Sequence, residues 1–598
     1  MSNTQRTGVE RGQRIGMSLE KPRNQRQTLT RIWHYMRNER LAVWVAIVTV
    51  VLFTLLQLVG PWLIGVIIDD YILKLDIEGT ITMVLILGST YVATFGVTYI
   101  QMVAMIFVAQ KTIRRLRQQL FEKLQRLPIH FFDRQQQGDL MSRVTNDIDS
   151  LNMALTQSIT QILSSVLMVV GVAVAMFLME WRLAIVALTV IPLIVFVTKQ
   201  IIKRSSVNYK ARQRDLGALN GYIEETISGT EVVTLFGQEQ HVSETFHEKN
   251  EKLRHSALHA ETISGMMGPF NNAMNGIGLT LVIGAGAFFI LQGYTTVGVL
   301  AAFVTYTRQF FRPINQLSNL LNIFQAAIAG AERVFDVLDE DDEVQDKQGA
   351  VVATHFDGHV RFQDVSFSYN EGTPILKNIS FEAQRGQMIA LVGPTGSGKT
   401  TVINLLTRFY DVDSGQIEID GRPIGDYTMH SLREHVGIVL QDTYLFSGTI
   451  RENIRFGKLH ATDEEVEEAA KVAYAHQFIR HLPNQYDTMI TSGGTNLSQG
   501  QRQLLAIARA ILEDPDILIL DEATSNVDTR TEVHIQHGLL NLMNGRTSFV
   551  IAHRLKTIEQ ADQILVLQQG EILEQGSHQQ LMEKQGFYYN MQTKTQAR

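Results

Sequence analysis

The chain has 598 residues. A single hydrophobic core does not usually organise a chain of that length, so at least two domains are expected. The formal net charge of −7 gives no sign of a positively charged surface that would bind nucleic acid, so we expect no nucleic-acid partner. The absence of cysteine from the sequence excludes disulfides, thiolate metal sites and cysteine nucleophiles.

Residues 1–40 are polar and Arg-rich. They contain no short apolar core followed by a small-residue cleavage site, so no cleavable signal is predicted. We expect a cytoplasmic N-terminal segment over residues 1–40.

Six apolar segments follow between residue 41 and about residue 311. A bilayer core roughly 30 Å thick needs about 20 apolar residues in a helix. The first four segments are nearly free of charge over that length, which favours membrane spans over the alternative of buried helices in a soluble protein. The predicted spans are Leu41–Ile68, Ile81–Val108, Ile159–Met179, Leu183–Ile202, Met266–Leu291 and Val297 to about Phe311.

The connections between these spans alternate between short and long. The long connections, 109–158 and 203–265, are rich in Lys and Arg and keep helical patterning. Basic loops tend to stay in the cytoplasm, so these connections are predicted to be helical extensions there. An even number of spans then leaves the C-terminal half, like the N-terminus, in the cytoplasm. The stretches Phe131–Leu140 and Gly221–Gly229 are either solvated tips or contacts with that half.

Polar residues inside the spans cost free energy unless they face other helices or water. Together with soft methionines and aromatic rings, they are typical of a cavity that binds apolar molecules with little discrimination. Packing against lipid or a neighbouring helix is the alternative for each of them. The candidates for a substrate cavity are Gln57, Gln101, Met105, Asn271, Asn275 and Phe310.

The pattern changes after the last span. We expect a transmembrane domain over 41–330, a linker over 331–355 and a second domain over 356–598. That domain begins with short strands at Val360–Phe362, Ile379–Ala383 and Met388–Val392, and a helix is predicted at Thr401–Tyr410. The predicted fold class is a six-span α-helical transmembrane domain fused to a cytoplasmic α/β domain that binds phosphate.

The strand Met388–Val392 runs into a glycine-rich loop, and a helix follows it, which is the context of a phosphate loop. Its glycines let backbone N–H groups curl around phosphates, and the next helix presents its positive end to the same anion. Lys399 supplies a point charge, and the Thr400 hydroxyl suits Mg²⁺. The loop is Gly393, Pro394, Thr395, Gly396, Ser397, Gly398, Lys399 and Thr400.

Two carboxylates, Asp521 and Glu522, follow the aliphatic run Ile517–Leu520. Asp521 would hold Mg²⁺ through water, and Glu522 is placed to polarise an attacking water. A helix N-cap explains one acid after a buried strand but not the pair. We therefore predict an ATPase that needs ATP and Mg²⁺.

A further segment, Leu497, Ser498, Gln499, Gly500 and Gln501, precedes that strand. Motifs in this order resemble the nucleotide-binding domain of an ATP-binding cassette (ABC) transporter, and the six spans resemble its exporter branch. The resemblance implies that two such domains close head to tail over ATP. Segment 497–501, the signature segment, would then face the nucleotide of a partner.

The resemblance also implies roles for single residues. Tyr369 would stack on adenine, and Thr401 would join the nucleotide-binding residues. Gln441 would contact Mg²⁺ and the water, and His553 would bond the γ-phosphate. Asp528 would cross the dimer seam. Glu522, His553 and Gln441 are the expected catalytic residues, and Thr400, Gln441 and Asp521 the metal-binding ones.

Gln499 departs from the usual Leu-Ser-Gly-Gly-Gln, and a long side chain there should hinder or redirect the contact with the partner's phosphate. The loop 491–496 also lacks the family's glutamate, and Asn526 replaces a commoner alanine. An intact catalytic set beside an altered signature is similar to one subunit of bacterial heterodimeric multidrug exporters. That resemblance implies a non-identical partner and residence in the cytoplasmic membrane. A homodimeric lipid or peptide exporter, and an ATP-gated channel or sensor, remain alternatives.

Overall fold

The computed structural model describes residues 24–343, 346–370, 372–441, 443–521, 529–551 and 558–596. The chain forms two compact units. The helical unit comprises Met1–Arg126 and Gln135–Asp341, and the α/β unit comprises Leu127–Arg134 and Asp342–Arg598.

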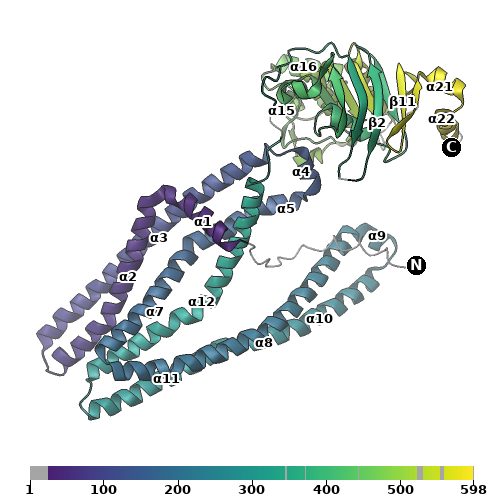
Figure 1. Cartoon of the computed structure of the whole chain (residues 1–598). Coiled ribbons are helices and arrows are strands. Elements are labelled where there is room, and N and C mark those ends of the chain that lie inside the picture. Colours follow the sequence, from purple (N-terminus) through teal and green to yellow (C-terminus); the bar gives the residue numbers. More distant parts are fainter. Residues whose placement is uncertain are drawn as a thin grey trace. The chain divides into compact units, whose positions relative to one another are not determined.

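Long helices make up the helical unit (Figure 1). Two short π-helical turns, Arg143–Asp147 and Ala154–Ser158, join α5, α6 and α7 into one run. The helices are α1 (Gln25–Met36), α2 (Arg40–Val66), α3 (Ile77–Leu124), α5 (Gln137–Ser142), α6 (Ile148–Met153), α7 (Ile159–Met179), α8 (Trp181–Ser228), α9 (Thr230–Leu235), α10 (Glu239–Gly265), α11 (Met267–Leu291) and α12 (Val297–Leu338).

In the described part of the chain, five helical runs are long and apolar enough to cross a membrane. Each of them contains one of the first five predicted spans. The sixth prediction falls on α12, a single helix of 42 residues. Large apolar side chains on α3 are exposed, among them Val92 and Phe95 at 72% and 74%, as expected for a surface that lipid covers. The five runs are Gln25–Ile72, Ile77–Leu124, Gln137–Met179, Trp181–Ser228 and Glu239–Leu291.

Small residues let α2 and α12 approach each other closely. A Cβ atom on Gly298 would lie 2.2 Å from the carbonyl oxygen of Gly65, so only glycine fits at this crossing. The Asp69 carboxylate accepts a hydrogen bond of 2.8 Å from the Gly298 backbone N–H and another from the Thr296 hydroxyl. The first of these bonds satisfies one of the backbone N–H groups that a helix leaves unpaired at its start.

The end of α12 contacts α1 and the turn before α6. Arg31 pairs with Asp339 and lies over the Phe335 ring, 4.2 Å from its centroid. Arg333 donates two hydrogen bonds to the buried carboxylate of Asp147. Charged groups thus hold the last turns of α12 to two other parts of the helical unit.

The helices α8 and α10 run side by side, and α9 lies at their connection (Figure 1). Apolar side chains are exposed there: Ile227 at 68%, Leu235 at 78% and Phe236 at 68%. The predicted tip 221–229 therefore lies at the C-terminal end of α8, beside an apolar surface.

The α/β unit contains a mostly parallel sheet in the order β12-β11-β3-β10-β9-β6, in which only β12 is antiparallel. A second sheet, β2-β1-β4-β5, is antiparallel, and β7 pairs with β8. The strands are β1 (Val360–Phe367), β2 (Leu376–Ala383), β3 (Met388–Val392), β4 (Ser414–Ile419), β5 (Arg422–Pro423), β6 (Val436–Val439), β7 (Gly448–Thr449), β8 (Met489–Ile490), β9 (Ile517–Asp521), β10 (Thr547–Ile551), β11 (Gln563–Gln568) and β12 (Glu571–Gly576).

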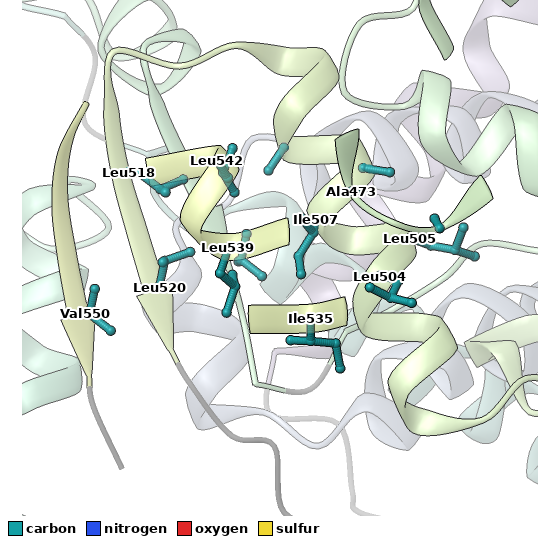
Figure 2. Packing of buried hydrophobic residues seen from close by; sticks show 14 of the residues in the cluster. Ala473, Leu504, Leu505, Ile507, Leu518, Leu520, Ile535, Leu539, Leu542 and Val550 are labelled. Atoms are coloured by element: carbon teal, nitrogen blue, oxygen red, sulfur yellow. The ribbon is translucent and has the colours of Figure 1, made fainter. Parts of the chain in front are cut away.

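Helices cover these sheets. Figure 2 shows Leu504 and Ile507 of α18 near Ile535 and Leu539 of α19, beside Leu520 of β9. This burial fixes the start of α18 relative to the end of β9. The helices of this unit are α4 (Ile129–Arg134), α13 (Lys399–Leu406), α14 (Met429–Glu434), α15 (Ile450–Arg455), α16 (Asp463–Val472), α17 (His476–Ile479), α18 (Gln499–Glu513), α19 (Thr529–Met543), α21 (His578–Lys584) and α22 (Phe587–Gln596).

Candidate functional site

The phosphate loop leaves the carboxyl end of β3 and enters α13. Three of its glycines have positive φ: 155° at Gly393, 81° at Gly396 and 103° at Gly398. A Cβ atom on Gly393 would lie 2.2 Å from the Leu567 carbonyl oxygen, so a side chain has no room there. The loop is a concave backbone surface at the start of a helix, the form that binds phosphate.

Lys399 begins α13 and folds back over this loop. Its Nζ donates to the carbonyl oxygens of Gly393 at 2.8 Å and Pro394 at 3.0 Å. Burial lowers the pKa of Lys399, and the charge of Asp521 acts against that shift. The loop therefore already holds a buried cation next to a carboxylate, as an anionic ligand with a metal ion requires.

Asp521 comes to the same edge of the sheet as the phosphate loop. In the parallel sheet, Leu391 of β3 pairs with Ile551 of β10, and Ile551 pairs with Asp521 of β9. Carboxyl ends of neighbouring parallel strands meet at one edge, which is where such folds bind ligands. The predicted residues Glu522, Asp528 and His553 lie outside the described residues.

Tyr369 follows β1 and contacts α13. Its hydroxyl donates to Thr401 Oγ1 at 3.3 Å and accepts from Asn404 Nδ2 at 3.1 Å. The Tyr410 ring packs edge-on against it, with centroids 5.0 Å apart. The ring is thereby held beside the helix that follows the phosphate loop, as the predicted stacking on adenine requires.

Helix α4 belongs to the α/β unit although its sequence lies in the first long loop. Its Asp133 accepts a hydrogen bond from the Tyr410 hydroxyl. Arg134 donates to the Tyr369 carbonyl oxygen at 3.4 Å. Of the two interpretations of segment 131–140, contact with the nucleotide-binding half is therefore the one that these bonds favour.

The signature segment forms the start of α18. Ser498 is the N-cap: its hydroxyl accepts from the Gln501 backbone N–H, and the Gln501 side chain accepts from the Ser498 N–H. This capping box orients the helix end with Ser498 exposed. Leu497 and Gly500 are buried, while Gln499 is half-buried and lines one cavity with Gln441.

Sequence reasoning missed two residues of the nucleotide site. Asn404 lies five residues after Lys399 and three after Thr401, so helical spacing could have indicated its contact with Tyr369. Tyr410 reaches the site only through tertiary packing, and no local pattern signals it.

The cavity candidates of the helical unit lie in different environments. Met105 and Phe310 are buried at 3% and 6%, and Phe310 belongs to the cluster of α7, α8, α11 and α12. Asn271 is 9% exposed, and its Oδ1 atom has no hydrogen-bond partner among the described residues. Gln57, Gln101 and Asn275 are half-buried.

The residues present fit a nucleotide with Mg²⁺. The Ser397 hydroxyl oxygen is buried in the loop without a partner in the described parts of the chain. Thr400, in contrast, is exposed. The Ser397 hydroxyl, the buried Lys399 cation near the Asp521 carboxylate and the exposed Thr400 hydroxyl match the oxygens of phosphates and a hard metal ion.

Comparisons with known proteins agree with this chemistry. Residues 43–314 match the family model described as ABC transporter transmembrane region, and residues 376–525 match the model described as ABC transporter. The chain is similar to an uncharacterized ABC transporter ATP-binding protein, YfiC, of Bacillus subtilis (strain 168). The two are 47% identical over 571 residues, and this alignment covers 96% of this chain and 94% of that protein.

A fatty acid ABC transporter ATP-binding/permease protein of Mycobacterium bovis (strain ATCC BAA-935 / AF2122/97) is 43% identical over 515 residues, covering 86% of this chain and 81% of that protein. The fold is also similar to the solved structure of a bacterial Atm1-family ABC exporter with ATP bound. The TM-score is 0.74 and the sequence identity 31%, and the superposition covers 93% of this chain and 98% of that chain.

The predicted fold class is therefore confirmed: a helical transmembrane domain is fused to an α/β ATPase domain. The predicted enzyme class is confirmed as well, an ATPase that uses ATP with Mg²⁺ and drives translocation. The chain belongs to the ABC transporter family and carries the membrane and ATP-binding domains of an exporter.

Proposed function

We propose that the chain is one half of a heterodimer that exports hydrophobic or amphipathic compounds across the bacterial cytoplasmic membrane. The observation that carries this proposal is Gln499 in the first turn of α18, beside the N-cap Ser498. The same chain keeps Lys399, Asp521 and Glu522. An altered signature with an intact catalytic set calls for a partner that supplies an unaltered signature.

Two different ATP sites then form between the subunits. The productive site combines Lys399, Thr400, Asp521, Glu522 and His553 of this chain with the partner's signature segment. The other site receives this chain's Ser498, Gln499 and Gly500 and mainly holds nucleotide. Asp528 crosses the seam between the domains.

The residues of this chain have separable tasks in the productive site. Tyr369 stacks on the base, and Lys399 neutralises charge on the terminal phosphates. Glu522 and Gln441 orient the attacking water, and His553 stabilises the phosphoryl group. Such a site works by positioning and charge neutralisation, with little covalent chemistry for the protein to do.

Closure of the two ATPase domains must reach the membrane through the cytoplasmic loops. Helix α4, bonded to Tyr369 and Tyr410, is one point of transfer. The exposed apolar end of the α8–α10 hairpin, with Leu235 and Phe236, suits a contact with the partner's ATPase domain. The helical domain then alternates between inward and outward access, a shift that a modest difference in substrate affinity between the two states biases.

The compound carried is apolar or amphipathic. Support comes from Met105 and Phe310, apolar side chains packed between the helices, and from the amides Gln57, Gln101, Asn271 and Asn275, which add polarity without charge. The N-terminus, the C-terminus and the ATPase domain lie in the cytoplasm. A homodimeric lipid exporter is the second candidate, because the M. bovis relative is named for fatty acids.

The test is to co-express the chain with its neighbouring homologue and measure ATP turnover after Glu522→Gln in this chain alone. We expect turnover to fall at least 100-fold, with MgATP binding retained. Turnover near the native rate would place catalysis in the partner's site. If the chain purified by itself turns over ATP at two equal sites and accumulates lipid in vesicles, the homodimer is correct. Conductance without accumulation would indicate a channel.

A further inference from the structure

A cavity of about 190 Å³ lies beside the first turn of α18, and amide side chains from two separate motifs line it. Gln441 comes from the segment after β6. Gln499 and Gln503 lie four residues apart, one turn of α18, so both reach the same side of the helix. The remaining wall consists of Thr443, Gly493, Thr495 and Arg502.

Two polar atoms in this wall are buried and have no hydrogen-bond partner within the described ranges: Gln503 Oε1 and Thr443 Oγ1. Gln503 is 4% exposed. An unpaired buried polar group costs about 1–3 kcal/mol, so such groups normally bond to protein or to water. The cavity volume accommodates several water molecules at about 30 Å³ each.

Gln503 also lines a second cavity, of about 80 Å³, with Asp521 at the end of β9. Gln536 and Gln560 contribute further amides there, next to the apolar side chains of α19. One buried amide therefore stands between the metal-binding end of β9 and the cavity that contains Gln441 and Gln499. Its NH₂ and carbonyl groups are able to bond on both sides at once.

We propose that Gln503 is a positioning residue that joins Asp521, Gln441 and Gln499 of the same chain into one water-bridged polar network. The inference rests on the proposed function, because it concerns the two unequal ATP sites. Asp521 and Gln441 serve the nucleotide on this chain's phosphate loop. Gln499 belongs to the segment that faces the partner's nucleotide. The network thus couples one site to the other.

This arrangement assigns a structural role to Gln499, the unusual residue of the signature segment. Glycine at position 499 has no side chain, so the network would then contain no group from the segment that faces the partner's nucleotide. Glutamine adds an amide that lies in the same cavity as Gln441. Gln499 weakens the contact of the signature segment with the partner's phosphate. In exchange, it adds a polar connection to Gln441 and Gln503 of its own chain.

The test uses the purified complex with its partner subunit, and it measures ATP turnover without any transported compound. Gln503→Met keeps the side-chain length and removes every hydrogen bond. We expect kcat to fall about tenfold, with KM for MgATP within twofold and Tm within about 2 °C of the native complex. The matched control is Gln477→Met on α17, an exposed glutamine of the same unit, which should change nothing.

A second measurement separates a network from simple packing. If Gln499 and Gln503 act together, Gln499→Gly combined with Gln503→Met lowers kcat no further than Gln503→Met alone. The proposal is overturned if kcat of Gln503→Met stays within twofold of native, if its KM rises together with a loss of Tm, or if the two effects multiply. This experiment measures ATP turnover and no transport. Its result can therefore be interpreted even if the export proposal fails in vesicles.

Discussion

The Tyr410 hydroxyl donates a hydrogen bond to the Asp133 carboxylate, which lies 277 residues earlier in the chain. Burial raises the pKa of Tyr410, and the bond to Asp133 raises it further. The Tyr410 ring also packs edge-on against Tyr369. The residue expected to stack on adenine is therefore connected to α4 in two ways, through the Tyr410 ring and through the bond from Arg134 to its own carbonyl oxygen.

This relationship predicts the effect of Tyr410→Phe, which keeps the ring and removes the hydroxyl. We expect MgATP affinity within twofold of native, because the Tyr369 hydroxyl bonds to Thr401 and Asn404 instead. Transport per ATP hydrolysed should fall several-fold, since α4 loses a charge-assisted bond of about 1.5–3 kcal/mol. Vesicle uptake measured together with phosphate release gives this ratio.

The control for that variant is Tyr589→Phe on α22, which should leave the ratio at its native value. An unchanged ratio in Tyr410→Phe would mean that α4 transmits nothing through this bond.

A buried ion pair predicts a stability change in the helical unit. Asp147 is 4% exposed and accepts two hydrogen bonds from Arg333, one of them at 2.9 Å. Asp147→Ala leaves the guanidinium without this partner, and we expect a loss of about 2–3 kcal/mol, less than for a pair buried on both sides. Thermal unfolding of the purified protein in detergent measures it.

Asp139→Asn is the comparison for the ion pair. Asp139 is 59% exposed and pairs with Arg143 one turn away, so its loss should cost less than about 1 kcal/mol. Equal effects of the two variants would contradict the role assigned to burial.

The crossing of α2 and α12 predicts that Gly298→Ala is poorly tolerated. The new methyl group would lie 2.2 Å from the Gly65 carbonyl oxygen, a backbone atom that moves only if the helices separate. We expect a cost of about 1–3 kcal/mol or more, seen as a lower folded yield and a lower Tm. Gly96→Ala on α3 is the control, because its methyl group would meet nothing within 4 Å.

Glu513 predicts a pH dependence of stability. Burial raises its pKa to about 7, against the lowering effect of Arg509. A carboxyl group with a raised folded pKa binds more protons in the folded than in the unfolded state between that value and its ordinary pKa near 4.5. Its stability contribution is therefore complete below about pH 4.5 and is lost as the pH rises through about 7.

The loss amounts to about 3 kcal/mol at most, from about 1.4 kcal/mol for each pKa unit. Tm of the full-length protein, measured from pH 5.5 to 8, should fall less steeply for Glu513→Gln than for the native protein. Parallel curves for the two proteins would contradict the assignment.

The sequence by itself determined the membrane and nucleotide chemistry of this protein. Apolar runs of membrane length need no tertiary context to be recognised, since the bilayer thickness sets their length. The phosphate loop is likewise local: Gly393 to Gly398 connect β3 directly to α13, and Lys399 and Thr400 begin that helix. The pair of acids, Asp521 and Glu522, was predicted because they follow an aliphatic run typical of a buried strand.

The boundaries and the partners of those residues depended on tertiary structure. Strand β1 runs to Phe367, five residues beyond the predicted end at Phe362, because pairing with both β2 and β4 extends it. Helix α13 starts at Lys399, two residues before its predicted start, and ends at Leu406. Single-residue patterns carry no information about such pairings.

Only the fold brought Asp133 to Tyr410, Arg333 to Asp147, and Gln441 into one cavity with Gln499. These residues are far apart in the chain, and each alone resembles an ordinary surface or core residue. Their contacts form because packed helices and sheet edges bring them together, so the contact between α4 and the nucleotide-binding half is a property of the tertiary structure. The residues that bind nucleotide, in contrast, form local motifs that the sequence alone shows.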